Sequence, residues 1–322
     1  MLDGTISFGP QQSFDIVTTL CTGTLIAPDV VMLAAHCVDT NALTGGFGEV
    51  TRADFYVTFD ADLSAYAEQS ELGAEPLPLP ASAVPVRSFV ANSDFNINAL
   101  GPNGTTGTES DIALLFLEVP ITTVQPEIVI TAAEATQLSV GDDVSIAGWG
   151  QRGSAQDSPA GIKQCGTTTL DELGPALMQI GADPASIRKC HGDSGGPTYT
   201  QVETSASIKR RVIGVTSRAY DESDCAKGGV DTRVDAYLDF LDEQMTAACT
   251  AGTRSWCDVA GIIPASFYEE GGEGEGEGEG EGEGEGEGEE PADDCSHIPG
   301  NGMFALSLLT LLARRKRSPL SK

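Results

Sequence analysis

The chain contains few histidines and few basic residues. Of its 322 residues, three are histidine, and 18 lysine and arginine residues stand against 48 aspartate and glutamate residues, which gives a formal net charge of −30 at pH 7. This balance argues against nucleic-acid binding, because proteins that bind phosphate backbones need clustered positive charge. Twelve of the acids fall between Glu269 and Glu290, so the charge says little about a substrate.

Metal-binding and membrane-spanning motifs are also missing. The sequence has no His-Glu-x-x-His motif, and its histidines His36, His191 and His297 are too few and too scattered to predict a dedicated zinc site. We therefore expect no metal. The apolar run from Met303 to Ala313 has 11 residues, whereas a helix needs roughly 20 apolar residues to cross a bilayer.

Three segments carry the residue types of nucleophilic catalysis, in the chain order His, Asp, Ser. Residues 190–197, CHGDSGGP, place Ser194 among glycines that let a turn present its hydroxyl and aim backbone N–H groups at a carbonyl oxygen. His36 stands just before Cys37 at the end of an apolar run, and Asp111 begins the apolar segment DIALLFL. A serine hydroxyl needs a nearby base, and a carboxylate behind an imidazole fixes its tautomer. The segments therefore predict a serine hydrolase.

The serine loop also permits another class of hydrolase. Gly192-x-Ser194-x-Gly196 fits the nucleophile elbow of α/β-hydrolases, which would favour an esterase. That fold needs an acid and then a histidine after the serine, and only His297 follows, beyond a low-complexity run. We interpret His191, inside the serine loop, as a residue at the rim of the cleft rather than as the base.

Four ordered motifs resemble those of trypsin/chymotrypsin-type serine endopeptidases over about residues 8–246: LAAHC around His36, DIAL at Asp111, GWG at Gly148–Gly150 and CHGDSGGP around Ser194. The resemblance implies an all-β fold of two antiparallel six-stranded β-barrels with a C-terminal helix. It also implies hydrolysis of peptide bonds in proteins or peptides through an acyl-enzyme, without a cofactor.

The same resemblance assigns roles to residues. His36 would be the base, Asp111 its carboxylate partner and Ser194 the nucleophile, and the backbone N–H groups of Gly192 and Ser194 would form the oxyanion hole. The positions that it implies for the substrate pocket are Arg188, Lys189, Ser217, Arg218, Ala219 and Gly229. Ser217 would lie near Asp111, and residues 217–219 would pair with the substrate backbone as an added strand.

The base of this pocket departs from the family pattern. Members that cut after Lys or Arg usually carry an acid two residues before the cysteine of the serine loop, whereas this chain has Arg188 there, followed by Lys189. A basic pocket base would favour an acidic P1 side chain or a C-terminal carboxylate. The alternative is that Arg188 turns to solvent or pairs with a nearby acid.

The start of the chain is a second departure. In the family, a freed N-terminal amine pairs with the aspartate before the nucleophile, here Asp193. No IVGG-like segment precedes Cys21, and the first stretch, MLDGTISFGPQQ, lacks the basic and apolar regions of a signal peptide. We expect that the given start lies inside a longer gene product. The alternative is a protein that orders its oxyanion loop differently.

Eight cysteines indicate an oxidising compartment. The resemblance implies disulfides Cys21–Cys37 and Cys190–Cys225, and Cys249 and Cys257 are close enough in sequence to close a small loop. Two cysteines, Cys165 and Cys295, remain. Cys165 would be free, paired outside the usual scheme, or paired with a cysteine upstream of the given start.

Composition divides the chain into five parts. Short apolar runs such as DFYVTFDADL, DVSIAGWG and RRVIGVTS predict strands, and the apolar spacing of Val234–Met245 predicts a helix. The expected parts are a first barrel with His36 and Asp111 (1–120), a second barrel with Ser194 and the helix (121–247), a short cysteine-containing extension (248–268), a Glu/Gly-rich disordered linker (269–294) and a sorting or anchor segment (295–322).

The tail predicts a location. Alternating Gly and Glu from Gly272 to Glu289 has no apolar face to bury, which is typical of an extended, disordered spacer. A short motif, an apolar run and the basic cluster Arg314–Arg317 resemble the tripartite C-terminal sorting signals of bacterial surface proteins. Cleavage or lipid attachment near Cys295 would make a sorting protease or the membrane a partner. The alternatives are a marginal membrane anchor and a buried amphiphilic end.

These observations predict an exported, surface-tethered serine endopeptidase. The competing class is a binding or adhesive module that keeps the protease fold without turnover. The unusual N-terminus and the basic pocket base keep that class open.

Overall fold

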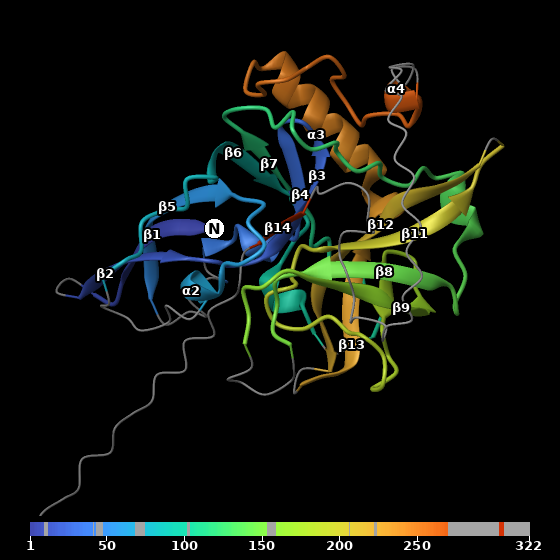
Figure 1. The fold of residues 1–322 in the computed structure, drawn as a ribbon, viewed down its shortest axis with the longest axis horizontal. Helices are drawn as coiled ribbons and strands as arrows, with labels where there is room; N and C mark the ends of the chain where they lie inside the picture. Colours follow the sequence, from blue (N-terminus) through green and yellow to red (C-terminus); the bar gives the residue numbers. More distant parts are fainter. Residues whose placement is uncertain are drawn as a thin grey trace, which may run out of the picture.

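The computed structural model describes the chain except for residues 10–11, 41, 43–47, 68–74, 102–103, 153–158, 206, 222–223, 270–302 and 306–322. The described residues form two antiparallel sheets that lie side by side, with the helix α3 across one end (Figure 1). The predicted linker and anchor segment fall almost wholly outside the described residues. In the described part of the chain, no helix is both long and apolar enough to cross a membrane.

The first sheet contains the strands between residues 2 and 117, together with one short strand from near the end of the chain. Its strands, in spatial order, are β14 (Met303–Ala305), β3 (Thr22–Ala27), β4 (Val30–Leu33), β7 (Ala113–Leu117), β6 (Val84–Ala91), β5 (Glu49–Val57), β1 (Leu2–Ser7) and β2 (Ser13–Thr18). Among the described residues it is an eight-stranded sheet rather than the closed six-stranded barrel that we expected, and β14 and β2 form its two ends. β3, β4 and β7 are buried along their full length, which explains why the sequence of β7 is almost continuously apolar.

The second sheet is the closed six-stranded barrel that the sequence predicts. Its strands are β10 (Leu177–Ile180), β13 (Asp224–Arg233), β12 (Ile208–Asp221), β11 (Pro197–Glu203), β8 (Asp143–Gly148) and β9 (Gln164–Leu173). The chain is therefore mostly β with a C-terminal helix, as expected. Short helices complete the fold: η1 (Ala35–Cys37), α2 (Ser64–Ala67), η2 (Ile97–Ala99), η3 (Glu134–Gln137), η4 (Val234–Tyr237), α3 (Leu238–Thr250) and α4 (Ser266–Glu269).

The predicted helix is split into two elements. Residues 234–237 form the 3-10 turn η4, and the α-helix α3 begins at Leu238 and ends beyond Met245, at Thr250. Val234, Leu241 and Met245 are fully buried, so the apolar face that the spacing predicts does pack on the core.

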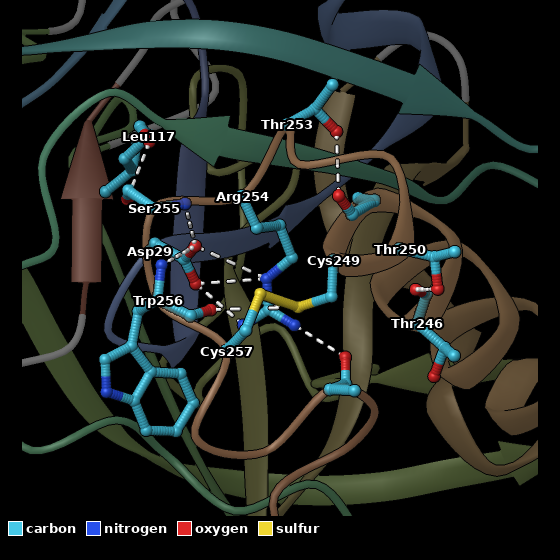
Figure 2. Close-up of a disulfide and its surroundings, with 12 residues drawn as sticks. Asp29, Leu117, Thr246, Cys249, Thr250, Thr253, Arg254, Ser255, Trp256 and Cys257 are labelled. Carbon is cyan, nitrogen blue, oxygen red and sulfur yellow. Dashed lines mark hydrogen bonds and ion pairs between the residues drawn. A yellow bond between two sulfur atoms is a disulfide. The ribbon is translucent and has the colours of Figure 1, made fainter.

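An extension beyond α3 is fastened to the first sheet (Figure 2). The disulfide Cys249–Cys257 closes a loop that carries Arg254. The Arg254 side chain is completely buried and donates to Asp29, in the tight turn between β3 and β4, with an Nη2 to Oδ1 distance of 2.7 Å. The backbone N–H groups of Ser255 and Trp256 also donate to the Asp29 carboxylate, each at 2.9 Å. The extension therefore links the helix that follows the second barrel to the core of the first sheet.

Candidate active site

His36 and Asp111 meet because their strands are neighbours. His36 lies in η1, just after β4, and Asp111 lies just before β7, while the two strands pair antiparallel with Leu33 opposite Ala113. The two side chains therefore share one edge of the sheet. The His36 Nδ1 is 2.7 Å from Asp111 Oδ2, and the backbone N–H of His36 donates to Asp111 Oδ1 at 2.9 Å.

Residues of the second barrel fix the Asp111 carboxylate. The Ser217 hydroxyl donates to Asp111 Oδ2 at 2.6 Å, as the sequence resemblance implies, and the Thr232 hydroxyl donates to the Asp111 carbonyl at 3.0 Å. Ser110, just before Asp111, has φ of 50°, a conformation that non-glycine residues adopt only when their surroundings impose it. Asp111 itself has no exposed surface. The acid is therefore held rigidly behind the imidazole by both halves of the molecule.

The pKa of His36 is raised above its ordinary value of 6.5. Burial alone would lower it, because a buried imidazole loses the hydration of its charged form, but the negative charge of Asp111, the hydrogen bond to it and the negative charge of Asp39 together outweigh burial. This environment favours the imidazolium that forms when the ring accepts a proton.

The Ser194 loop is fastened beside this pair. The N–H of Thr22 donates to the Ser194 carbonyl at 2.7 Å, and the neighbour of Thr22, Cys21, forms a disulfide with Cys37, next to His36. Gly195 has φ of +79°, and a Cβ there would lie 2.2 Å from the Thr22 carbonyl oxygen, so the loop can approach the first sheet only with glycine at this position.

The backbone of this loop leaves two donors unused. In the described part of the chain, the N–H groups of Gly192 and Ser194 have no hydrogen-bond acceptor. No hydrogen bond joins the Ser194 hydroxyl to the His36 ring within the same residues. Bonds of this kind commonly tighten only when a substrate is bound.

Asp193 has backbone partners. Its carboxylate accepts the N–H of Gly150 at 2.9 Å and the N–H of Cys190 at 2.8 Å. Burial raises its pKa to about 6, although these hydrogen bonds oppose the shift. A cavity of about 290 Å³ borders Asp193, with Arg188 on its wall. The amino group of Met1 lies elsewhere and donates to the Tyr56 carbonyl.

The two basic residues that the resemblance assigns to the pocket base both have hydrogen-bond partners. The Lys189 ammonium contacts both carboxylate oxygens of Asp231, at 2.9 and 2.6 Å, and the Thr198 hydroxyl at 2.5 Å. Arg188 donates through Nη1 to the carbonyls of Pro184 and Ala226, at 3.0 and 3.2 Å. In the structure, Asp231 therefore neutralises the charge of Lys189, whereas the sequence alone suggests that this charge is unpaired.

The remaining pocket positions lie on two paired strands. Ala219 of β12 stands opposite Gly229 of β13. Arg218 is bound by Glu109 through both carboxylate oxygens and by the Gly104 carbonyl. Sequence reasoning missed Glu109 and also Asp231, because acidic residues are frequent in this chain and no local pattern marks these two.

The structure forms the three predicted disulfides, Cys21–Cys37, Cys190–Cys225 and Cys249–Cys257. Cys165 is also disulfide-bonded and hence not free, while Cys295 lies outside the described residues. Cysteines beside His36 and His191 come close enough to those rings for metal ligation, but their disulfides leave no thiolate to bind a metal.

The fold and the site define the class of trypsin-like serine proteases. Residues 79–241 match the family model described as Trypsin, and the chain belongs to this family. Human serine protease 56 is 27% identical over 243 residues, which cover 71% of this chain and 35% of that protein. Trypsin of Saccharopolyspora erythraea is 25% identical over 245 residues, covering 70% of this chain and 87% of that protein.

Two further proteins are also similar to this chain. The vitellin-degrading protease of Bombyx mori is 24% identical over 242 residues, covering 70% of this chain and 76% of that protein. The solved structure of neuropsin, a serine protease of mouse brain, aligns with a TM-score of 0.48 and 19% identity, over 76% of this chain and 93% of that one. The chain spans only about a third of the length of serine protease 56.

Proposed function

We propose that this protein is a serine endopeptidase that cleaves proteins or peptides through His36, Asp111 and Ser194. The observation that carries the proposal is the buried His36–Asp111 pair, with its 2.7 Å contact and its Ser217 support, beside the glycine-rich Ser194 loop. A buried carboxylate that orients an imidazole toward a serine loop is the arrangement that activates a weak hydroxyl nucleophile.

In this mechanism, the Ser194 hydroxyl attacks the scissile carbonyl carbon while His36 Nε2 accepts its proton. Asp111 holds the Nδ1–H tautomer and stabilises the imidazolium. The free N–H groups of Gly192 and Ser194 bind the oxyanion of the tetrahedral intermediate, and one such donor is typically worth about 2.7–4 kcal/mol of transition-state stabilisation. His36 then gives its proton to the leaving amine. Water then takes the place of the amine. His36 accepts a proton from the water as it attacks the acyl carbonyl carbon, and returns that proton to the Ser194 oxygen as the acid product leaves.

An open strand edge supports a peptide substrate. The pairing of β12 with β11 ends with Val215 opposite Pro197, whereas the pairing of β12 with β13 continues to Asp221. Among the described strands, residues 217–219 therefore have a neighbour on one side only. An extended peptide can add to the other side as a further strand, which would present its carbonyl to Ser194.

We further propose that the enzyme is exported and held at the cell surface. Its disulfides are typical of an oxidising compartment. The tethering part of the proposal depends on the tail sequence alone, with its Gly-Glu spacer, apolar run and basic cluster. A sorting protease or the membrane would be the partner of this tail.

Fluorophosphonate labelling tests the catalytic proposal. The protein should be produced with its disulfides formed, and the adduct located by mass spectrometry. We expect one adduct, on Ser194, and none in the matched control Ser194→Ala. Folded, processed protein without label would contradict the proposal and favour a binding module that lacks turnover.

A further inference from the structure

The side chain of Lys189 is buried deep beside the proposed substrate pocket. It is 3% exposed, and its partner Asp231 is 0% exposed. The ammonium contacts both Asp231 oxygens and the Thr198 hydroxyl, and that hydroxyl in turn donates to Asp231 Oδ2 at 2.5 Å. An ammonium group has three protons and accepts no hydrogen bond. Every donor of Lys189 is therefore used inside this cluster.

The stem of Lys189 passes under the pocket wall. A Cβ placed on Gly229 would lie 3.3 Å from the Cβ and 3.5 Å from the Cδ of Lys189, so the aliphatic chain runs along the inner side of β13. Gly229 faces Ala219 on the strand that would hold the substrate. The Lys189 stem thus packs against Gly229, a position that the resemblance assigns to the pocket wall.

Asp231 is packed tightly against Gly214, which in turn lies against Met178. A Cβ on Gly214 would lie 2.5 Å from Asp231 Oδ2 and 2.3 Å from the Met178 methyl group, and Met178 is fully buried. The cluster is therefore packed on its far side and cannot recede to admit a long side chain without breaking buried contacts.

We propose, on the basis of the proposed function, that Lys189, Asp231 and Thr198 form an electrically neutral plug that makes the pocket shallow. The substrate class that fits such a pocket has a short, uncharged P1 residue: Gly, Ala, Ser or Thr. An acidic P1 side chain finds no free donor on Lys189, and a basic one finds the Asp231 carboxylate already neutralised. A charge buried without a partner is strongly disfavoured, so both classes are rejected.

Kinetics on a series of peptide anilides that differ only at P1 test this proposal. Active enzyme is first counted by fluorophosphonate titration. We expect kcat/KM for P1 Ala to exceed that for P1 Asp, Glu, Lys, Arg or Phe by about 100-fold. Preference for any of these five residues, in enzyme that takes the label, overturns the plug and leaves the catalytic proposal intact. Protein that takes no label refutes both.

Two variants separate the plug from its neighbours. Lys189→Ser removes the cation and exposes the Asp231 carboxylate, so cleavage after P1 Arg and Lys should rise at least about tenfold relative to P1 Ala. The double variant Lys189→Ser with Asp231→Ser leaves no buried charge in this cluster, which protects against misfolding. It should accept P1 Leu or Phe but should not show the increased cleavage after P1 Arg. An unchanged P1 profile in the double variant contradicts the proposal.

Arg188 supplies the rival explanation for the P1 specificity. Its Nη1 is already bound by two carbonyl groups, and it lines the cavity beside Asp193. If Arg188 rather than the plug sets specificity, the enzyme prefers acidic P1 residues and Arg188→Ala abolishes that preference. Loss of the preference for P1 Ala in Arg188→Ala would contradict the plug, because Arg188 would then set the specificity.

Discussion

Replacement of Arg254 by methionine tests how much the buried Arg254–Asp29 ion pair contributes to the stability of the fold. Arg254 and Asp29 are both fully buried, and two nitrogens of the guanidinium donate to the carboxylate. Arg254→Met keeps most of the volume but leaves the Asp29 charge with only the N–H groups of Ser255 and Trp256. Removing one partner of a buried ion pair costs about 3–5 kcal/mol. This is a large share of a typical total stability of about 5–15 kcal/mol.

Equilibrium unfolding in urea, followed by tryptophan fluorescence, measures the loss. The double variant Arg254→Met with Asp29→Asn should recover much of it, because the uncompensated charge is gone and the asparagine oxygen still accepts from the backbone. Asp29→Asn alone should also destabilise, since it leaves the Arg254 cation buried.

Arg52 is a matched control on the same protein. It also binds two carboxylates, those of Asp3 and Asp54, at 2.6 and 2.7 Å, but its side chain is 43% exposed. Exposed ion pairs contribute about 0–1 kcal/mol, so Arg52→Met should change the free energy of unfolding by less than about 1 kcal/mol. Equal losses in Arg254→Met and Arg52→Met would refute the claim that burial decides the difference.

Three further predictions concern the active site. The acid limb of kcat/KM should titrate above pH 6.5, because Asp111 raises the pKa of His36 and only the neutral ring accepts a proton; in Asp111→Asn, any residual activity should titrate at lower pH. The native pKa of Asp193 is about 6 against an ordinary 3.8, so the native state holds more protons between these values and the free energy of unfolding should fall as pH rises through this window. Urea titrations of Asp193→Asn should show a smaller fall, and the remainder belongs in part to Glu127, whose pKa burial raises to about 7. Gly195→Ala should lose at least about 2 kcal/mol of stability and should no longer take the fluorophosphonate label, because φ is positive at this position and the new Cβ would clash with the Thr22 carbonyl oxygen. Near-normal labelling would contradict the role given to that contact.

Sequence patterns predicted those parts of the fold and the site that depend on local order. The fully buried β7 was visible as an almost unbroken apolar run, and short apolar runs separated by turns predicted further strands. The closed second barrel was predicted from the family resemblance alone. The chain order of His36, Asp111 and Ser194 pointed to residues that the structure gathers at one sheet edge and a neighbouring loop. These features follow from residues close in sequence or from a fixed order of motifs.

Long-range charge pairing could not be predicted in this way. Arg254 binds Asp29 across 225 residues, and Arg218 binds Glu109 across 109. With 48 acids in the chain, each cation has many candidate partners, and only the packing of strands decides among them. The same holds for the left-handed Ser110, whose conformation is imposed by its surroundings rather than by its residue type.

Lys189 illustrates why residue type alone misleads at a binding site. From the sequence alone, a lysine at the proposed pocket base is expected to bind an acidic substrate group, because its charge is assumed to be unpaired. In the structure, Asp231 lies 42 residues away in sequence yet satisfies the same ammonium. A buried cation recognises a ligand only through donors that no protein atom already uses. The number of unused donors, rather than the sign of the charge, therefore decides whether Lys189 attracts a substrate carboxylate or fills the space in which one would bind.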